Sequence, residues 1–516
     1  MLTALLSGLV ILASGPANRA RAASAPARPH VQALMTAPAG SSRVSTPLLA
    51  MTRSVDYSQT PANFRTAYSL PKTGARHQTI AVVSAYNDPS VQSDLNDYTK
   101  RFGIRPCTIA NGCFRELNQE GAASPLPETD PTGEVFLAES SIGTEIARGI
   151  CQSCRILLVE ANAADEADIS VSVKTAIDAG ATVVVTAFNQ SEAATDPKLA
   201  GNYSSPRAVV VAASGDTSYT QLPLFPATLP NVLAVGGTDL ALSASGSRLG
   251  ETAWQGTTSG CSLHESAPAW QSVAAKSVGC GTRRAEVDLS AAADPGALVR
   301  VQDAPSPCGK KWCAALGTSV AAPIIAGVIG LAGSDGSGEA RLLYQHFTSN
   351  PGAFHDITSG ANGNCGGKPI CTARKGYDGP TGLGTPDGLA AFLRNGGVVN
   401  RSRPGFTIAS PSGALRVSSG WTTTLTLRNG NAFALRGSIA LQGKARVGGR
   451  IRPVTFASRS FTLGSLGSAA VKLTIANAGR QLLSQLRSAQ VTIAVRLRGP
   501  AGAAVNTSRS RRLIAP

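Results

Sequence analysis

A serine between a glycine and an apolar helix is the first residue of this sequence whose setting suggests chemistry. Residues 316–323 read Leu-Gly-Thr-Ser-Val-Ala-Ala-Pro, and the apolar run after them predicts a helix over 319–333 that opens with Ser319. A serine at a glycine-flanked helix start is expected to be exposed, with its hydroxyl in the positive field of the helix N-terminus, which suits a nucleophile. The same position also suits a serine that only caps the helix.

A second polar motif, Ser214-Gly215-Asp216, follows the apolar run Arg207–Ala213. Taken alone, Asp216 is an ordinary turn aspartate. Cys151 and Cys154 form a CxxC pair, which fits a disulfide, a redox site or half of a zinc site. The histidines show no ligand-spaced cluster, so a structural disulfide is the favoured interpretation.

These motifs together resemble those of the sedolisins, a family of serine-carboxyl peptidases with a subtilisin-like fold. Gly-Thr-Ser-x-x-x-Pro is similar to the nucleophile motif that subtilisins and sedolisins share, and Ser-Gly-Asp is similar to the sedolisin oxyanion motif. The resemblance is to an actinobacterial-type secreted branch and covers residues 66–395. It is supported by three more stretches in the family's order, namely 106–114 (PCTIANGCF), 150–162 (ICQSCRILLVEAN) and 234–239 (AVGGTD).

The resemblance implies a set of catalytic residues. Subtilisins use a histidine base followed by glycine, and no histidine here precedes a glycine. Sedolisins use a Glu and an Asp four residues apart on one helix, together with a protonated aspartate in the oxyanion hole, which suits work in acid. The implied catalytic residues are Ser319 as the nucleophile, Asp216 at the oxyanion hole and Glu139, which an ungapped alignment from Cys151 places on the helix.

The second carboxylate of the pair departs from the family pattern, because the aligned position is Gly143. Glu145 and Glu134 lie six and five residues from Glu139, about 120° and 140° round a helix, so neither replaces it. The segment Phe188–Ser191 also differs from the Ser-Tyr-Gly-Gly that the family has. Reduced or lost activity is therefore expected, and Gly143→Asp is expected both to raise activity and to improve the helix.

One calcium ion is implied by the same resemblance. Residues 354–360 (FHDITSG) and 376–387 (GYDGPTGLGTPD) are similar to the family's calcium loop. Carboxylates and backbone carbonyls form the all-oxygen set that calcium prefers. By motif, Asp356 and Asp378 supply carboxylates, whereas Ile357, Arg374 and Gly376 supply carbonyl oxygens.

The elements that must position these residues alternate between strands and helices. Apolar runs at 79–85, 155–161, 181–187, 207–213 and 231–236 have the length of buried strands, and 91–101 and 165–179 read as helices. Continuous apolar strands between helices predict an α/β fold, with a parallel sheet covered by helices on both faces. This pattern agrees with the subtilisin-like fold that the resemblance implies.

The charge pattern changes near residue 400. Residues 401–516 hold 18 Lys and Arg and no Asp or Glu, which leaves 47 − 18 = 29 basic and 31 acidic residues before them. Short alternating segments at 422–428, 438–442, 471–475 and 491–497 predict a small immunoglobulin-like β-sandwich over 404–516. The basic charge is either a solvated face or a means of holding an anionic cell-envelope polymer. Nucleic acid is not expected, because aromatic residues there are few and scattered.

The N-terminal residues and the cysteines indicate export. An apolar run from Leu2 to Ala13, followed by Ala20-Arg21-Ala22, predicts a signal peptide over 1–22, and 23–65 reads as a flexible leader or short pro-segment. The run is too short to span a membrane. Ten cysteines in five close pairs predict disulfides: 107/113, 151/154, 261/280, 308/313 and 365/371.

Two functions follow from these observations. The first is a secreted serine-type endopeptidase that acts on proteins or peptides through an acyl-enzyme at Ser319. The second is a non-catalytic protein on the same scaffold that binds peptides or the cell envelope. Retention of Ser319, Glu139 and Asp216 favours the first, and Gly143 favours the second. We expect a secreted monomer.

Overall fold

The computed structural model describes residues 51–52 and 58–516, apart from 76, 131–135, 195, 220–221, 303–310, 334–335, 337–338, 394–405, 410–413, 430–434, 448–449, 465–467 and 499–503. The predicted signal peptide 1–22 and most of the predicted leader 23–65 lie outside the described residues, as does Glu134. In the part of the chain that is described, no helix is long and apolar enough to cross a membrane.

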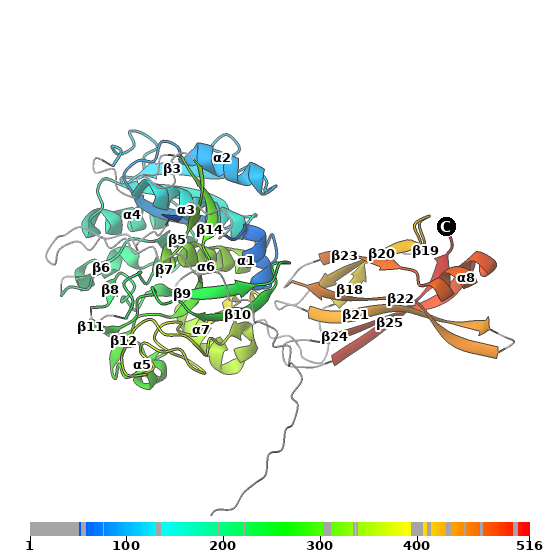
Figure 1. The fold of residues 1–516 in the computed structure, drawn as a ribbon. Helices are drawn as coiled ribbons and strands as arrows, with labels where there is room; N and C mark the ends of the chain where they lie inside the picture. Colours follow the sequence, from blue (N-terminus) through cyan, green and yellow to red (C-terminus); the bar gives the residue numbers. More distant parts are fainter. Residues whose placement is uncertain are drawn as a thin grey trace, which may run out of the picture. The chain divides into compact units, whose positions relative to one another are not determined.

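A mostly parallel sheet forms the centre of the first domain (Figure 1), with strand order β10–β9–β7–β5–β2–β4–β3 and with β13 also paired to β9. Only β10 runs antiparallel to its neighbour. The parallel sheet predicted from the sequence is confirmed. Its strands are β2 (Thr79–Ala85), β3 (Phe114–Asn118), β4 (Arg155–Ala161), β5 (Val183–Thr186), β7 (Val209–Ala213), β9 (Val232–Leu242), β10 (Arg248–Ala253) and β13 (Leu289–Asp294).

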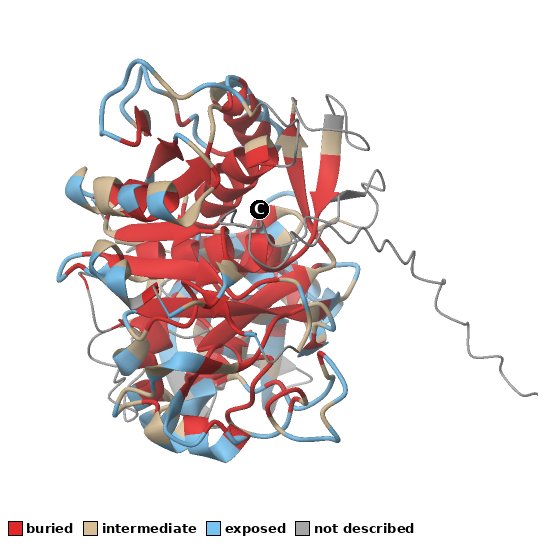
Figure 2. Cartoon of the chain, turned by 90° about the vertical axis from the view of Figure 1, so that its left-hand side faces the viewer, coloured by how far each residue is buried: buried red, intermediate tan, exposed pale blue. Residues whose placement is uncertain are grey.

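The central strands are buried on both faces, which explains their continuous apolar sequences. Alternate residues of β2 enter different clusters: Ile80 and Val82 face one core, and Ala81 and Val83 face the other. The strands are correspondingly red in Figure 2. The sheet is therefore a rigid platform, and its carboxyl edge is where functional loops are expected.

Helices cover the two faces of this sheet. On one side α3 (Phe136–Ile150) packs against α6 (Thr318–Ala332), and on the other α4 (Glu166–Asp178) packs through Ile169 and Val173. The α3–α6 contact is close because Gly327 lacks a side chain. A Cβ there would lie 2.6 Å from Cβ of Ile150. This close approach brings the first turn of α3 to the start of α6.

The first domain begins before the predicted boundary at residue 66. Helix α1 (Pro61–Ala67) is capped by Thr60, whose side chain accepts a hydrogen bond from the N–H of Asn63. Phe64 is buried, and the Arg65 guanidinium donates to the carbonyl of Gly149 at the end of α3. The last residues of the predicted leader therefore belong to the folded domain.

The predicted helix over 91–101 is present as α2 (Val91–Arg101). Shorter elements complete the first domain around the sheet. These elements are β1 (Met51–Thr52), α2 (Val91–Arg101), β6 (Gln190–Ser191), η2 (Asp196–Lys198), η3 (Ala200–Tyr203), β8 (Leu224–Phe225), β11 (Cys261–Ser266), α5 (Ser272–Val278), β12 (Arg283–Ala285), β14 (Ala297–Val301), β15 (Lys311–Ala315), α7 (Glu339–Ser349), η4 (Pro351–Ala353), β16 (Phe354–His355), β17 (Thr385–Pro386) and η5 (Ala390–Phe392).

Disulfides cross-link loops of this domain, as the cysteine spacing predicted. Four predicted pairs are bonded: 107–113, 151–154, 261–280 and 365–371. Cys313 is also disulfide-bonded, and its predicted partner Cys308 lies outside the described residues. The bonded Cys151–Cys154 pair favours the structural interpretation of the CxxC motif over a zinc site.

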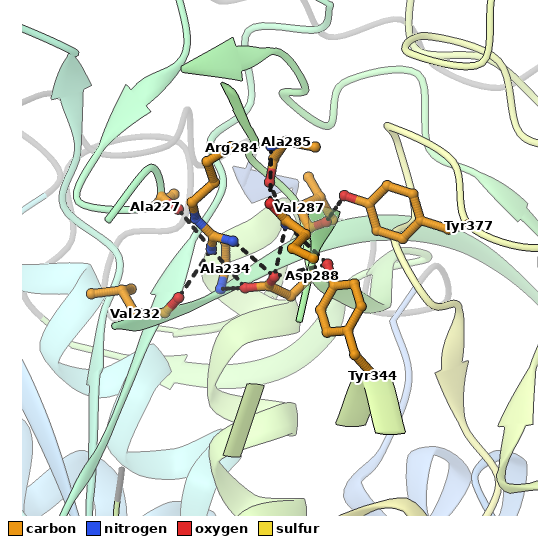
Figure 3. Close-up of polar contacts among 10 residues, drawn as sticks. Ala227, Val232, Ala234, Arg284, Ala285, Val287, Asp288, Tyr344 and Tyr377 are labelled. Carbon is orange, nitrogen blue, oxygen red and sulfur yellow. Dashed lines mark hydrogen bonds and ion pairs between the residues drawn. The ribbon is translucent and has the colours of Figure 1, made fainter. Parts of the chain in front are cut away.

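A buried ion pair fastens the segment between β12 and β13 to the central sheet (Figure 3). Arg284 Nη2 lies 2.8 Å from Asp288 Oδ2, and both side chains have 0% exposure. Asp288 also accepts a hydrogen bond from the N–H of Ala234 in β9 and one from the Tyr344 hydroxyl. The guanidinium donates further to two backbone carbonyls, those of Ala227 and Val232.

Removing one partner of this ion pair should strongly destabilise the protein. Arg284→Met leaves Asp288 as a buried, uncompensated charge, which typically costs about 3–5 kcal/mol of unfolding free energy. Urea unfolding of the variant measures this loss. Arg283→Met is the matched control, because Arg283 is exposed and should lose less than about 0.5 kcal/mol. Equal unfolding midpoints for the two variants would contradict a structural role for the pair.

The C-terminal region, described by itself, consists of two sheets that share one core, and all their strand pairs are antiparallel except β19 with β25. Buried leucines of β20 and β23 pack with buried residues of β21 and β24. One sheet is β18 (Phe406–Ala409), β20 (Thr422–Asn429) and β23 (Ser468–Thr474). The other has the order β19 (Leu415–Arg416), β25 (Ala504–Ile514), β24 (Ser488–Arg498), β21 (Leu435–Val447) and β22 (Arg450–Leu463), and α8 (Asn477–Leu486) joins β23 to β24. The predicted β-sheets of this region are confirmed, α8 was not predicted, and the immunoglobulin-like topology stays a prediction.

Candidate active site

Ser319 lies in the first turn of α6, directly after the sheet-side loop that ends at Gly317. Its expected exposure was wrong, since only 1% of the residue is accessible. The reason is the close packing of α3 on α6, which places Glu139 over the serine. Ser319 Oγ donates a hydrogen bond to Glu139 Oε1 at 2.9 Å. The structure thus brings together two residues that are far apart in the sequence.

Glu139 is a buried carboxyl group, with 3% of the residue exposed. Burial raises the pKa of Glu139 to about 8, the hydrogen bond from Ser319 opposes this rise, and the charge of Asp216 adds to it. As a carboxylate, Glu139 is within reach to accept the Ser319 proton, which is the geometry of a general base. Proton transfer to it requires that it first be ionised, and burial makes this harder.

Asp216 lies at the carboxyl end of β7 and contacts the start of α6. Its Oδ1 accepts hydrogen bonds from the N–H and the hydroxyl of Thr318, at 2.9 Å and 2.7 Å. Its covered Oδ2 has no partner among the described residues. Burial raises the pKa of Asp216 to about 7, although both hydrogen bonds from Thr318 oppose the rise. Below that pH, Oδ2 carries a proton that can be donated to an oxyanion.

Gly317 allows this approach of Asp216 to the helix. A Cβ at residue 317 would lie 2.2 Å from Asp216 Oδ2, and the residue has a φ of 108°. Glycine is thus required both by the backbone conformation and by the neighbouring carboxyl group. The Asp216 loop is fixed from the other side by Thr258, whose hydroxyl accepts the N–H of Thr217 at 3.0 Å.

Gly143 occupies a position where no larger residue fits. A Cβ there would lie 2.6 Å from Cγ1 and 3.2 Å from Cγ2 of Val82 in β2. The expectation that an aspartate would improve this helix was therefore wrong. Glu145 indeed faces elsewhere, because its Oε2 accepts the backbone N–H of Arg300 at 2.8 Å. Among the described residues, no hydrogen bond other than the one from Ser319 reaches the Glu139 carboxylate.

The segment Phe188–Ser191 packs on the first turn of α3, a contact that sequence reasoning missed. Phe188 is buried and stacks on Phe136, with ring centroids 5.8 Å apart and an interplanar angle of 12°. Phe136 precedes Glu139 by three residues, so this stacking helps fix the turn that carries the carboxylate. The apolar residues 136 and 188 were the available signal, but nothing in their spacing paired them.

Asp88, in the turn Tyr86–Pro89 of the sequence, has the contacts of a turn residue. Its Oδ1 accepts the N–H and the hydroxyl of Ser90, two residues on. Ser141 of α3 donates to its Oδ2 at 3.2 Å. Asp88 therefore supports the start of α2 and does not contact Ser319 or Glu139 in any described hydrogen bond.

The five residues predicted to bind calcium lie in one loop region. The carboxylate of Asp356 accepts the N–H of Gly376 at 3.0 Å and 3.1 Å, and Asp378 Oδ2 accepts the N–H of Arg374 at 3.0 Å. Within the described residues, no donor contacts the carbonyl oxygens of Ile357, Arg374 and Gly376. The Arg374 guanidinium donates to the carbonyl of Ser277 instead. The arrangement leaves two carboxylates and three carbonyl oxygens available.

Charge in this loop also fits a cation. Burial raises the pKa of Asp378 to about 7, and the charge of Asp356 adds to the rise, while hydrogen bonds from Arg374 and Thr381 oppose it. No group of three or more His, Cys, Asp or Glu side chains in the described chain is placed to hold a metal. A site here would therefore depend on carbonyl oxygens, as calcium sites often do. Tyr377, within the loop, donates to the carbonyl of Val287 beside the Arg284–Asp288 pair.

Comparisons with known proteins agree with this fold. The family model described as "Subtilase family" matches residues 129–338. Sedolisin of Pseudomonas sp. (strain 101) is 37% identical over 191 residues, which is 34% of this chain and 30% of that protein. Kumamolisin of Bacillus sp. (strain MN-32) is 33% identical over 200 residues, 35% of each chain. The chain spans about a third of the length of these curated relatives.

A solved structure matches a larger share of the chain. Pseudomonas sedolisin, a serine-carboxyl proteinase complexed with two molecules of pseudo-iodotyrostatin, superposes with a TM-score of 0.54 and 25% identity. The superposition covers 64% of this chain and 95% of that one. The fold of the first domain is thus subtilisin-like. Over the matched residues, the chain is similar to the sedolisins.

The tight packing around Gly143 can be tested by substitution. Gly143→Asp alone should lower the unfolding free energy by about 1–3 kcal/mol, because the new side chain overlaps Val82 in a packed core. Adding Val82→Ala removes both γ carbons and leaves the nearest contact at 3.5 Å, so most of the loss should be recovered. Denaturant unfolding of the wild type and of these two variants measures this. Wild-type stability in Gly143→Asp would contradict the packing argument.

Proposed function

We propose that this protein is a secreted serine-type endopeptidase of the sedolisin class, which cleaves proteins or peptides through an acyl-enzyme at Ser319. The observation that carries the proposal is the hydrogen bond from Ser319 to the buried Glu139, next to an aspartate whose Oδ2 is available to donate. Nucleophile, base and oxyanion donor thus occupy three neighbouring positions on α6, α3 and the loop after β7. Disulfides in the domain support export.

The reaction follows from these positions. Ser319 Oγ attacks the scissile carbonyl carbon while Glu139 takes the hydroxyl proton, and the protonated Oδ2 of Asp216 donates to the developing oxyanion. Glu139 then gives its proton to the leaving amine, and the acyl group stays on Ser319. A water molecule, deprotonated by Glu139, attacks the ester and releases the second product. Glu139 gives the proton that it takes from water to the Ser319 oxygen as the ester breaks. Ser319, Glu139 and Asp216 therefore end as they began.

The two carboxyl groups must hold opposite protonation states for this reaction. Glu139, with a pKa of about 8, must be ionised, whereas Asp216, with a pKa of about 7, must be protonated. The required combination is a minor form, roughly a tenth or less of the protein at its maximum. Activity should therefore rise as Glu139 loses its proton, fall as Asp216 loses its own, and peak between these two pKa values.

Asp216→Asn tests this assignment through the shape of the pH profile. The amide of Asn donates at every pH, so the alkaline limb of kcat/KM should disappear. The negative charge that raises the pKa of Glu139 is also lost, so the acid limb should move to lower pH. Peptide hydrolysis from pH 4 to 10 provides the profile, with Ser319→Ala as the inactive control. An unchanged alkaline limb in Asp216→Asn would refute the oxyanion role.

A second candidate function has one specific observation in its favour. We propose that Gly143 stands at the position of the family's catalytic Asp. Glu139 therefore lacks the neighbouring carboxylate that the family has on this helix. Loss of the group that orients a catalytic base costs roughly 10⁴ in turnover in a comparable triad. The alternative is a non-catalytic protein that binds peptides on the same scaffold. A folded wild-type protein that binds but never cleaves peptides across that pH range would establish it.

We also propose one calcium site, held by the Asp356 and Asp378 carboxylates and by the carbonyl oxygens of Ile357, Arg374 and Gly376. When bound, the ion would neutralise the two carboxylates and hold the loop, which Tyr377 connects to Val287 near the central sheet. These residues stabilise the domain and lie outside the proton transfers described above.

Calcium should stabilise the protein more at neutral than at acid pH. Burial raises the pKa of Asp378. Without metal, the stability that this group contributes is therefore fully present below about pH 4 and is lost as pH rises through about 7. Calcium favours the ionised form and offsets this loss, by about 2.7 kcal/mol at a hundredfold excess over Kd. Thermal melts with calcium or chelator at pH 5 and 7.5 measure the difference.

The calcium assignment has a matched control. Asp378→Asn should abolish the calcium-dependent shift in Tm, whereas Asp178→Asn should keep it, because Asp178 is an exposed residue paired with Lys174. Identical melts of the metal-stripped wild-type protein with and without calcium would contradict the site. A shift of equal size in both variants would place the ion elsewhere.

We also propose that the protein is exported and monomeric.

A further inference from the structure

The basic charge of the C-terminal sandwich has no acidic partner within its own sequence. Residues 401–516 hold 18 Lys and Arg and no Asp or Glu. In the described chain, the ion pairs all join residues that precede residue 388. A fold with this composition can neutralise its arginines only with anions from outside it.

Strand register collects part of this charge on one side of the five-stranded sheet. Residues directly opposite each other on paired strands share a face, as do alternate residues of one strand. Arg496 of β24 is opposite Ser438 of β21, and Ser438 shares its face with Arg436, two residues away. Arg416 of β19 is opposite Ile514 of β25, and Ile514 shares its face with Arg512, two residues away. This outer face has five exposed basic residues: Arg416, Arg436, Lys444, Arg496 and Arg512.

The inner face of the same sheet forms the core of the sandwich, so the outer face is the solvent side. Ile439 and Leu441 of β21, and Ile493 of β24, point inward and are fully buried. Between the basic residues the outer face has uncharged polar side chains, most of them short: Ser438, Gln442, Ser458, Ser460, Thr462, Gln490, Ser508 and Ser510. The described part of the outer face contains no aromatic residue.

Other arginines of the domain have structural contacts that these residues lack. Arg459 donates to the carbonyl of Lys472, and Arg509 donates to that of Ile408, so both connect the two sheets. Among the described residues, the side chains of Lys444 and Arg496 make no hydrogen bond or ion pair. Arg512 makes a single contact, to the hydroxyl of Ser488. The outer face therefore presents cationic groups that the fold does not use.

We propose that this outer face binds a linear anionic polymer of repeated phosphodiesters without bases, such as a polyol phosphate of a cell envelope. Guanidinium groups form paired hydrogen bonds with phosphate oxygens, and short serines allow a chain to approach the sheet closely. The basic residues cross four strands, a span of about 14 Å at the usual strand spacing, which suits a polymer better than a single anion. Single-stranded nucleic acid would be expected to use stacking aromatics, and the described outer face has none.

The test uses the full chain with Ser319→Ala, so it does not depend on the proposed peptidase activity. The probe is a synthetic poly(glycerol phosphate), and binding is measured by sedimentation or calorimetry. The outer-face variant is Arg496→Ser with Arg512→Ser. The control, Arg428→Ser with Lys472→Ser, removes the same charge from exposed positions of the three-stranded sheet. Thermal melts check that both variants fold.

The parent protein should bind the polymer, with an affinity that falls as salt is added. The outer-face variant should lose affinity on the order of tenfold, and the control less than about twofold. Equal losses in the two variants would overturn the assignment of the face, and absence of binding at about 50 mM salt would overturn the proposal altogether. Tighter binding of a single-stranded oligonucleotide of equal charge would replace the proposed partner with nucleic acid.

Discussion

Burial of the carboxyl groups around Ser319 is the constraint on which the rest of the candidate site depends. Because Glu139 and Asp216 are removed from water, both hold protons to higher pH than free carboxylic acids do. The same burial turns Asp216 into a hydrogen-bond donor and makes Glu139 a base that is hard to ionise. Close packing of α3 on α6, made possible by Gly327, creates this environment.

Acidic side chains outside the candidate site also have pKa values raised by burial. Burial raises the pKa of Asp88 to about 6, of Glu116 to about 7 and of Glu160 to about 8, and in each a neighbouring acid adds to the rise. The folded state therefore binds more protons than the unfolded chain. The stability that these groups contribute is fully present below about pH 4 and is lost as pH rises through about 6 to 8. These three groups therefore contribute more stability in acid than at neutral pH.

Much of the first domain could be predicted because buried parallel strands read as continuous apolar runs. The predicted bounds of β2 and β4 equal the observed ones, and the family resemblance, aligned without gaps from Cys151, assigned Glu139 to the same site as Ser319. What failed depended on contacts between distant segments. Helix spacing could not show that Val82 fills the space beside Gly143, nor that α3 covers Ser319. Helix α1 was missed because seven residues are too few for a clear periodicity.

The most direct test of the proposed chemistry is covalent capture of the serine. A peptide p-nitrophenyl ester is mixed with the protein near pH 7.5, quenched in acid after milliseconds, and the intact mass is measured. The account predicts one acyl group per chain, mapped to Ser319, absent in Ser319→Ala and strongly slowed in Glu139→Gln. An unmodified wild-type chain, or equal acylation of Ser319→Ala, would contradict it.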